Sequence, residues 1–186
     1  MRIIAGSHKG RALAAPKGTR TRPTAGRTRE SIFNKLAHAS WSDGIEGKRV
    51  LDLFAGSGAL GFEAMSRGAA FCLFVETDTG ARGALRENVE TLQLSGTTSI
   101  YRRDAAAMGP KPAGLGAPFD LVFLDPPYGK GLGERALVGL IEGGWLSPEA
   151  IAVLEVGIDE MPDTPGWERL DEGEHGAARV VYLRRG

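Results

Sequence analysis

Short apolar runs alternate with amphipathic stretches over most of this chain. The apolar runs that fit buried strands lie at residues 49–54, 71–76, 98–102, 119–124 and 150–156. Between them, apolar residues recur at helical spacing at residues 59–67, 79–93 and 132–143. Continuously apolar strands separated by helices are typical of a parallel sheet that is covered on both faces. The pattern therefore predicts an α/β fold with a mostly parallel, twisted sheet and helices on both of its faces.

The two ends of the chain depart from this alternation. Two apolar stretches, 167–170 and 178–183, flank a Gly- and Glu-rich segment, which predicts an antiparallel C-terminal hairpin at the sheet edge. Residues 1–22 predict a small extended or hairpin element. Thr24 or Thr28 could then cap a helix, in which apolar residues recur at 32, 33, 36 and 37. We expect an N-terminal extension at residues 1–40 and one ligand-binding domain at residues 41–186.

Charge separates these two parts more sharply than composition does. Residues 1–40 hold nine Lys or Arg residues and one acid, a net charge of +8, so the rest of the neutral 186-residue chain carries −8. A basic arm on an acidic body indicates where a polyanion would bind. The predicted nucleic-acid contacts are Arg2, His8, Lys9, Arg11, Arg22, Arg27, Arg29 and, near the other motif, Lys130.

Several classes of protein are disfavoured by what the sequence contains. No apolar run approaches the roughly 20 residues of a membrane helix, and the first residues do not read as a signal peptide. The single Cys72 cannot form an internal disulfide, which fits a reducing, cytoplasmic setting. The three histidines are scattered without ligand spacing, so we expect no metal site.

A glycine-rich turn follows the first predicted strand. Gly56, Gly58 and Gly61 have the spacing G-x-G-x-x-G and open a helix, and Glu76 closes the next strand 20 residues after Gly56. Such glycines let the backbone approach a ligand closely, and the acid can accept hydrogen bonds from ribose hydroxyls. The turn therefore predicts a site for an adenosine-containing cofactor.

Asp52 bears on the choice between two such cofactors. It lies within the strand, four residues before Gly56, where a carboxylate would repel a pyrophosphate but could pair with an ammonium group. S-adenosylmethionine has an ammonium group, a sulfonium and no phosphate, so Asp52 favours it over NAD. At the third strand end, Asp104 is placed to accept a hydrogen bond from the adenine amino group.

The fourth strand end carries Asp125, Pro126, Pro127 and Tyr128. Prolines cannot continue a central strand, so the strand must stop here and present rigid groups. Asp125 and the Pro126 carbonyl could accept hydrogen bonds from an exocyclic amine and direct its lone pair at a methyl donor. The Tyr128 ring could stack on an extruded base. The motif therefore predicts methylation of a nucleobase amine, with catalysis mostly by alignment.

These residues carry a family resemblance over almost the whole chain. DPPY at 125–128 and DLFAGSGALG at 52–61 resemble the amino-methyltransferases of the Rossmann-like, S-adenosylmethionine-dependent class. MRIIAGSHKGRAL at 1–13 and RPTAGRTRESIFNKL at 22–36 resemble the RsmD family specifically. The resemblance implies methylation of N2 of one guanine in 16S ribosomal RNA, and a methyltransferase domain at 41–186.

The resemblance also implies a set of roles. The residues that would hold S-adenosylmethionine are Thr24, Asp52, Phe54, Gly56, Gly58, Glu76, Asp104 and Ala105, and those that would hold the guanine are Asp125, Pro126, Pro127 and Tyr128. Residues 1–40 would close over the cofactor and contact RNA. We expect a cytoplasmic monomer that acts on 16S rRNA within a small-subunit particle, without a membrane partner.

Other functions stay open at this point. DPPY serves adenine N6 and cytosine N4 as well, although a chain of this length leaves no separate domain for reading duplex DNA. An NAD-dependent oxidoreductase would explain the glycines and Glu76 but not Asp52. A non-enzymatic RNA-binding module would explain the basic arm but would leave Asp52 and residues 125–128 without a use.

Overall fold

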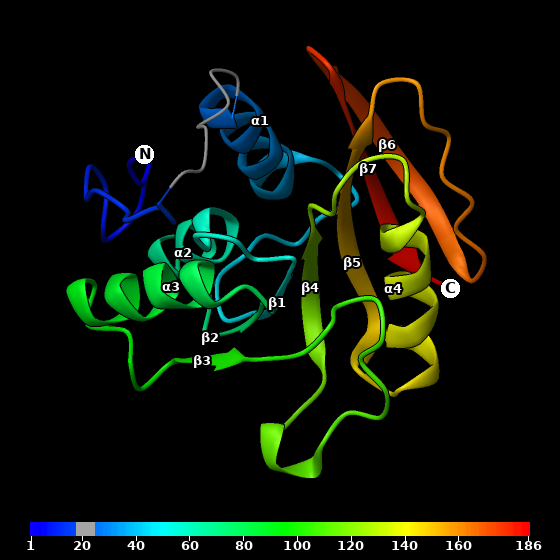
Figure 1. Ribbon diagram of the computed structural model, residues 1–186. Helices are drawn as coiled ribbons and strands as arrows, with labels where there is room; N and C mark the ends of the chain where they lie inside the picture. The colour runs from blue at the N-terminus through cyan, green and yellow to red at the C-terminus, as the bar shows by residue number, and fades with distance from the viewer. Residues whose placement is uncertain (18–24) are drawn as a thin grey trace.

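The computed structural model describes residues 1–17 and 25–186 of the chain (Figure 1). Its strands are β1 (Arg49–Leu53), β2 (Phe71–Val75), β3 (Thr98–Tyr101), β4 (Phe119–Leu124), β5 (Leu146–Gly157), β6 (Trp167–His175) and β7 (Ala178–Arg185). Its helices are α1 (Ala25–His38), α2 (Ala59–Ser66), α3 (Thr79–Thr91) and α4 (Leu132–Glu142), with a short 3₁₀ turn, η1, at Ala113–Leu115.

The strands form a single seven-stranded sheet in the order β3-β2-β1-β4-β5-β7-β6. The five strands β1 to β5 pair in parallel, whereas β7 pairs antiparallel with both β5 and β6. The order reverses direction between β1 and β4, and ligands bind open α/β sheets at such a reversal, beyond the carboxyl ends of the strands. The predicted Rossmann-like α/β fold with a C-terminal antiparallel hairpin is confirmed.

Helices cover both faces of the sheet because residues of opposite parity along each strand are apolar. On one face, Phe33 of α1, Phe62 of α2 and Leu85 of α3 pack with Phe74 and Phe123 of the strands. On the other face, α4 packs against β5, and its buried side chains belong to one core cluster with residues of β1, β2, β4 and β5 (Figure 1). Its apolar residues Ala136, Leu137 and Leu140 are all buried there. Burial on both sides explains why the central strands read as uninterrupted apolar runs.

The N-terminal residues form a small hairpin that is fixed to α2 by a buried acid. Arg2 and Ala12 form an antiparallel bridge. The Glu63 carboxylate, which is fully buried, accepts hydrogen bonds from the backbone N–H groups of Ile4 and Ala5 at 2.8 and 3.1 Å. It also pairs with Arg67 at 2.9 Å and with Arg29 of α1 at 3.6 Å. One side chain thus joins the hairpin, α1 and α2.

Two strands, β5 and β6, extend four or more residues beyond the ranges that the sequence predicts. β5 begins at Leu146 rather than at residue 150, because Pro148 and the positive φ of Glu149 (62°) conceal a strand that continues through an irregularity. There Phe119 pairs with Leu146, but Leu121 pairs with Ile151. β6 continues to His175, since the Gly- and Glu-rich residues expected in a turn lie on an edge strand, where charge is tolerated.

The helix predicted near residue 30 is α1, but the prediction that Thr28 could cap it is wrong. Thr28 lies inside α1 and is buried, so it is not the capping residue, and Thr24 lies outside the described residues. Most other predicted element boundaries agree with the structure within one or two residues. Over residues 1–17 and 25–186, no helix is long and apolar enough to cross a membrane.

Candidate functional site

Two adjoining cavities lie beyond the carboxyl ends of the central strands. One, of about 370 Å³, is lined by Asp52, Phe54, Gly56, Asp125 and Tyr128, among other residues. The other, of about 540 Å³, is lined at its strand-end side by Phe54, Glu76, Asp104, Ala105, Asp125, Pro126 and Pro127. Phe54 and Asp125 line both cavities, so the two are neighbours across these side chains. The fold therefore gathers residues predicted from four separate strand ends at one place.

The turn after β1 leaves space where a ligand would approach the backbone. Phe54 and Gly56 both have positive φ angles, 56° and 58°. A non-glycine residue in this conformation is uncommon and is concentrated at functional sites. No atom would lie within 4 Å of a Cβ at Gly56, whereas a Cβ at Gly61 would lie 2.4 Å from the Phe74 ring. Gly56 thus opens the site, and Gly61 permits close packing of α2 on β2.

Asp52 is the most perturbed acid of the site. Its side chain is buried, and its Oδ2 accepts a hydrogen bond from the backbone N–H of Gly61 at 3.0 Å. Burial raises the pKa of Asp52 well above its ordinary value, and the neighbouring carboxylates of Asp125 and Glu76 raise it further. A cation placed beside Asp52 would relieve both effects, which is the complement that an amino-acid ammonium group offers.

Glu76 holds the glycine-rich turn in place. Its Oε1 accepts a hydrogen bond from the backbone N–H of Gly56 at 2.8 Å, and its Oε2 accepts from those of Thr77 and Asp78 at 2.8 and 3.0 Å. Because an ionised carboxylate has about four lone-pair positions, Glu76 can still accept from ribose hydroxyls. Asp104, at the far side of the same cavity, is exposed and accepts from the N–H of Ala106 at 2.9 Å.

The end of β4 is rigid and partly buried. Pro126 is buried, Pro127 is exposed, and Asp125 and Tyr128 are half-buried at the cavity wall. The hydroxyl of Tyr128 donates a hydrogen bond to Oε1 of Glu155, the residue near the end of β5, at 2.6 Å. This bond fixes the ring of Tyr128 from the neighbouring strand.

These residues fit an S-adenosylmethionine molecule on the basis of their chemistry. Asp52 is a buried acid of raised pKa that a positive charge would stabilise in its ionised form. It lies near Gly56, where no atom would contact an added Cβ. Glu76 and Asp104 supply acceptors along the adjoining cavity, at the ends of the next two strands outward. A pyrophosphate at the same position would face three carboxylates, Asp52, Glu76 and Asp125, and so does not fit.

Comparisons with known proteins agree with this arrangement. The family model described as "Conserved hypothetical protein 95" matches residues 1–184. "Ribosomal RNA small subunit methyltransferase D" of Escherichia coli (strain K12) is 37% identical over 98% of this chain and 87% of its own length. The chain belongs to this family, the RsmD family that its motifs resemble.

Two further relatives extend the likeness to the full length and to a solved structure. "Putative rRNA methyltransferase YlbH" of Bacillus subtilis is 43% identical over the whole of both chains. The solved structure named "Putative methyltransferase yhhF from Escherichia coli" has a TM-score of 0.83 and 35% identity, and the match covers 100% of this chain and 97% of that one. The RsmD-family assignment thus includes the N-terminal hairpin as well as the sheet.

The basic residues predicted to contact RNA are distributed unevenly in this RsmD-family fold. Lys9, Arg27 and Lys130 are exposed. Arg2 and Arg11 are exposed as well, but each donates one hydrogen bond to a backbone carbonyl, of Gly10 and Thr91 respectively. His8 contacts the Leu92 carbonyl, and Arg22 lies outside the described residues.

Arg29 differs from the other predicted RNA contacts. It is buried, it pairs with Glu63 at 3.6 Å, and its Nη2 donates to the Arg2 carbonyl at 2.6 Å. Burial lowers the pKa of its guanidinium, and the Glu63 charge opposes that shift. This placement favours a structural role for Arg29, although the side chain also reaches the wall of the smaller cavity.

Sequence reasoning missed several residues that line the smaller cavity. Thr28 and Ile32 come from α1, Glu155 from β5, and His175 from the end of β6. Glu155 carried a signal that could have revealed it, because it lies close to the carboxyl end of a predicted strand, as Asp125 does. The others carried none, since only the packing of α1 and of the C-terminal hairpin brings them to the cavity.

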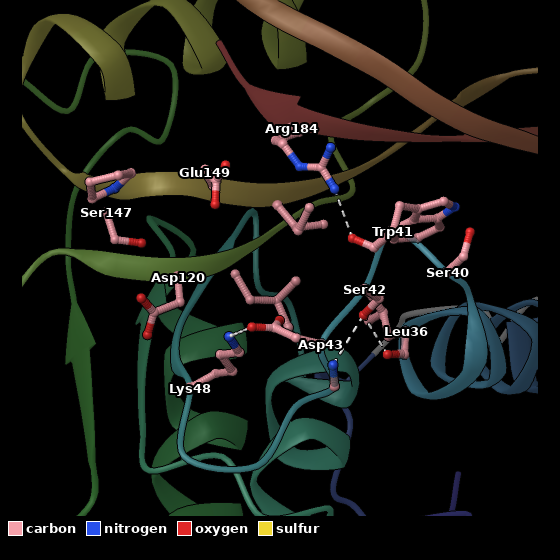
Figure 2. Close-up of a pocket in the computed structure, with 14 residues that line it drawn as sticks. Leu36, Ser40, Trp41, Ser42, Asp43, Lys48, Asp120, Ser147, Glu149 and Arg184 are labelled. Carbon is pink, nitrogen blue, oxygen red and sulfur yellow. Dashed lines mark hydrogen bonds and ion pairs between the residues drawn. The ribbon is translucent and has the colours of Figure 1, made fainter.

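A further cavity, of about 300 Å³, lies at the opposite end of the sheet (Figure 2). It is lined by residues near the start of β1, β4 and β5 and by Arg184 near the end of β7. Its cations are paired within the chain, Lys48 with Asp43 at 2.8 Å and Arg184 with the Trp41 carbonyl at 2.9 Å (Figure 2). No predicted site residue lines it, and it lies at the ends of the strands where α/β sheets do not bind ligands.

Proposed function

We propose that this protein transfers a methyl group from S-adenosylmethionine to the exocyclic N2 amine of one guanine in 16S ribosomal RNA. The observation that carries the proposal is the pairing of two acids at the ends of adjacent parallel strands. Asp52 on β1 is buried with a raised pKa, and Asp125 follows β4 at the wall of the same cavity. One acid suits the ammonium group of the cofactor, and the other suits the amine to be methylated.

Each residue of the site then has a defined task. When bound, S-adenosylmethionine supplies a methyl group attached to a positively charged sulfur, so the protein must chiefly align a nucleophile. Asp125 and the Pro126 carbonyl accept hydrogen bonds from the amine and so localise its lone pair, which in free guanine is delocalised into the ring. Proline fixes φ, so the carbonyl is positioned before the base arrives. The amine releases a proton once it has been methylated.

Tyr128 holds the base itself. Its ring lies at the cavity wall and is fixed through the hydroxyl by Glu155. Stacking of an extruded base on an aromatic ring contributes about 1–3 kcal/mol. Proteins that act on a base in this way take it out of its stack, which is easiest in an unpaired loop of RNA.

The relatives and the charge distribution support ribosomal RNA as the partner. The E. coli and B. subtilis relatives are named as rRNA methyltransferases. The net charge of +8 on residues 1–40 suits the phosphates of a large RNA, and we propose that this extension contacts the RNA of a small-subunit particle. The activity would then take place in the cytoplasm, with one copy of the chain acting as a monomer.

The alternatives are less well supported by the site. DNA adenine or cytosine could use the same Asp-Pro-Pro-Tyr residues, but the named relatives act on rRNA. An NAD-dependent oxidoreductase would place a pyrophosphate among Asp52, Glu76 and Asp125. A non-enzymatic RNA-binding module would leave the buried charge of Asp52 without a purpose.

The test is methylation of unmodified small ribosomal subunits with labelled S-adenosylmethionine, followed by mapping of the modified nucleotide. Label in a single guanine of 16S RNA, identified as N2-methylguanine by mass spectrometry, is the expected result. Naked 16S RNA and duplex DNA run in parallel distinguish particle, RNA and DNA substrates. Incorporation only into DNA, or none into RNA of any form, would refute the proposal. NADH should not compete with S-adenosylmethionine in calorimetry.

A further inference from the structure

We propose that Glu155 makes the site selective for guanine by accepting a hydrogen bond from guanine N1–H. This inference rests on the proposed function, because it concerns the base whose amine Asp125 receives. The Asp-Pro-Pro-Tyr residues recognise an exocyclic amine but not the ring that carries it. Selection among bases therefore requires a further group at the same cavity, and Glu155 lines that cavity.

Strand register places Glu155 beside Asp125. β4 and β5 pair in parallel with Leu124 opposite Leu154, so Asp125 and Glu155 follow at the same level along neighbouring strands. The preceding residues Leu124 and Leu154 face α4, whereas Phe123 and Val153 face α1 and α2. By the alternation of strand side chains, Glu155 points to the α1 side, where the cavity lies.

Three carboxylates thus follow one another across three adjacent strand ends. Asp52 on β1, Asp125 after β4 and Glu155 on β5 all line the 370 Å³ cavity. If Asp52 receives the ammonium group and Asp125 the reacting amine, the next group of the base lies toward β5. Glu155 is the acid that meets it there.

The chemistry of the bases gives this third carboxylate a selective effect. In guanine, the ring nitrogen next to the amine, N1, carries a hydrogen and is a donor. In adenine and cytosine the corresponding ring nitrogen, N1 or N3, carries a lone pair and is an acceptor. A carboxylate beside that position forms a charge-assisted hydrogen bond with guanine and repels the other two bases.

The contact between Tyr128 and Glu155 prepares the carboxylate for this task. The tyrosine hydroxyl donates to Oε1 at 2.6 Å, which fixes the orientation of the carboxylate relative to the ring on which the base would stack. An ionised carboxylate has about four lone-pair positions, so Glu155 can accept from the base in addition to the partners that it has within the chain. Stacking and edge recognition are thereby linked through one hydrogen bond.

The experiment compares two substrates that differ at N1. Small subunits are reconstituted with 16S RNA that carries either guanine or 2-aminopurine at the mapped nucleotide. 2-Aminopurine keeps the reactive 2-amine but has a lone pair at N1. Single-turnover rates are measured with the wild type, Glu155→Gln, Tyr128→Phe and the surface control Glu87→Gln. We expect the wild type to prefer guanine, and Glu155→Gln to reduce that preference by about 10- to 100-fold, as expected for loss of a charge-assisted hydrogen bond.

The ratio of the rates with guanine and with 2-aminopurine shows whether Glu155 contacts the base or only holds Tyr128 in place. 2-Aminopurine also lacks O6, but that loss affects every variant alike and cancels when variants are compared. If Glu155 only holds Tyr128, Glu155→Gln and Tyr128→Phe will lower both rates equally and leave the preference unchanged, which would overturn the inference. Glu87→Gln, the same change on an exposed position of α3, should match the wild type. Failure of the wild type to methylate the guanine subunits would instead refute the proposed function.

Discussion

Two buried acids on the same side of the sheet, Glu63 and Asp52, differ in how many donors and cations of the chain surround their carboxylates. Glu63 accepts two backbone N–H groups of the N-terminal hairpin and pairs with Arg29 and Arg67. Asp52, among the described residues, accepts one hydrogen bond, from Gly61, and lies near two further carboxylates. Within residues 1–17 and 25–186, Glu63 therefore meets two guanidinium groups and two N–H donors, whereas Asp52 meets one N–H donor and no cation.

The difference distinguishes a structural acid from a functional one. Burial of a charge is costly unless partners compensate it, so a structural acid collects its partners from the chain. An acid that lacks them destabilises the folded protein when ionised, and it persists where a ligand supplies the missing charge. By this criterion Glu63 supports the fold, and Asp52 fits the binding role that we propose for the strand ends.

The largest expected effect concerns Asp125, the acid that we propose accepts hydrogen bonds from the substrate amine. We expect Asp125→Ala to reduce methyl transfer by about 1,000-fold, since a fixed acceptor for the reacting amine would be lost. Binding of S-adenosylhomocysteine, measured by calorimetry, should change by less than about threefold, because Asp52 and Glu76 remain. Near-normal turnover would show that Asp125 does not orient the amine. Loss of cofactor binding would show that Asp125 contributes to the cofactor site, as we expect of Asp52.

The next effect tests the structural half of the comparison. We expect Glu63→Gln to lower the free energy of unfolding by about 3 kcal/mol, because two buried or half-buried guanidinium groups would lose their carboxylate. Urea denaturation measures this loss, and hydrogen exchange at the Ile4 and Ala5 amides should accelerate. The matched change Glu87→Gln on exposed α3 should stay within about 0.5 kcal/mol of the wild type. A Glu63→Gln protein of unchanged stability would remove the distinction drawn above.

The contacts of Glu63 are harder to predict from sequence than the central strands are. The central strands can be recognised as apolar runs because both of their faces are buried, and this pattern predicts the parallel sheet. Glu63 gives no such signal, because it sits inside an apolar helix and its partners Ile4 and Arg29 are distant in sequence. The start of β5 was missed for a related reason: Pro148 and Glu149 break the apolar run while the strand continues.

Within the site, sequence reasoning succeeded where the fold itself determines the position. The carboxyl ends of parallel strands converge, so Asp52, Glu76, Asp104 and Asp125 could be brought together without knowing any contact. Thr28 and His175 could not, because they reach the cavity from α1 and from the end of β6 by packing alone. That Glu76 binds the Gly56 amide was equally hidden, since the sequence indicates an acceptor but not its donor.

A smaller effect tests whether Asp52 is held for a cation. Asp52→Asn keeps an oxygen that can accept from the Gly61 amide but removes the charge. We expect cofactor affinity, measured by calorimetry, to fall by about 10- to 100-fold with the loss of a charge-assisted hydrogen bond. Affinity equal to that of the wild type would mean that the ammonium group binds elsewhere.

The same substitution should have the opposite effect on stability. Because the folded protein raises the pKa of Asp52 above its unfolded value, ionised Asp52 destabilises the fold at neutral and alkaline pH, and this cost fades as the pH falls. The ligand-free Asp52→Asn protein should therefore melt at a higher temperature than the wild type, with a difference that narrows toward acidic pH. Cofactor binding by the wild type should weaken in the same direction, since protonated Asp52 cannot pair with a cation.

The smallest effect concerns the outer surface of the hairpin whose inner surface Glu63 fixes. Arg2, Lys9 and Arg11 are exposed there, and we expect their combined replacement by Gln to weaken RNA binding and to flatten its dependence on salt. Each lost phosphate contact should reduce the slope of log affinity against log salt by about 0.7–0.9. Lys48→Gln is the control, because that cation is paired with Asp43 at the opposite end of the sheet (Figure 2). An unchanged slope in the triple variant, with stability intact, would mean that the hairpin only packs on α2, and that the RNA follows another surface to the cavity.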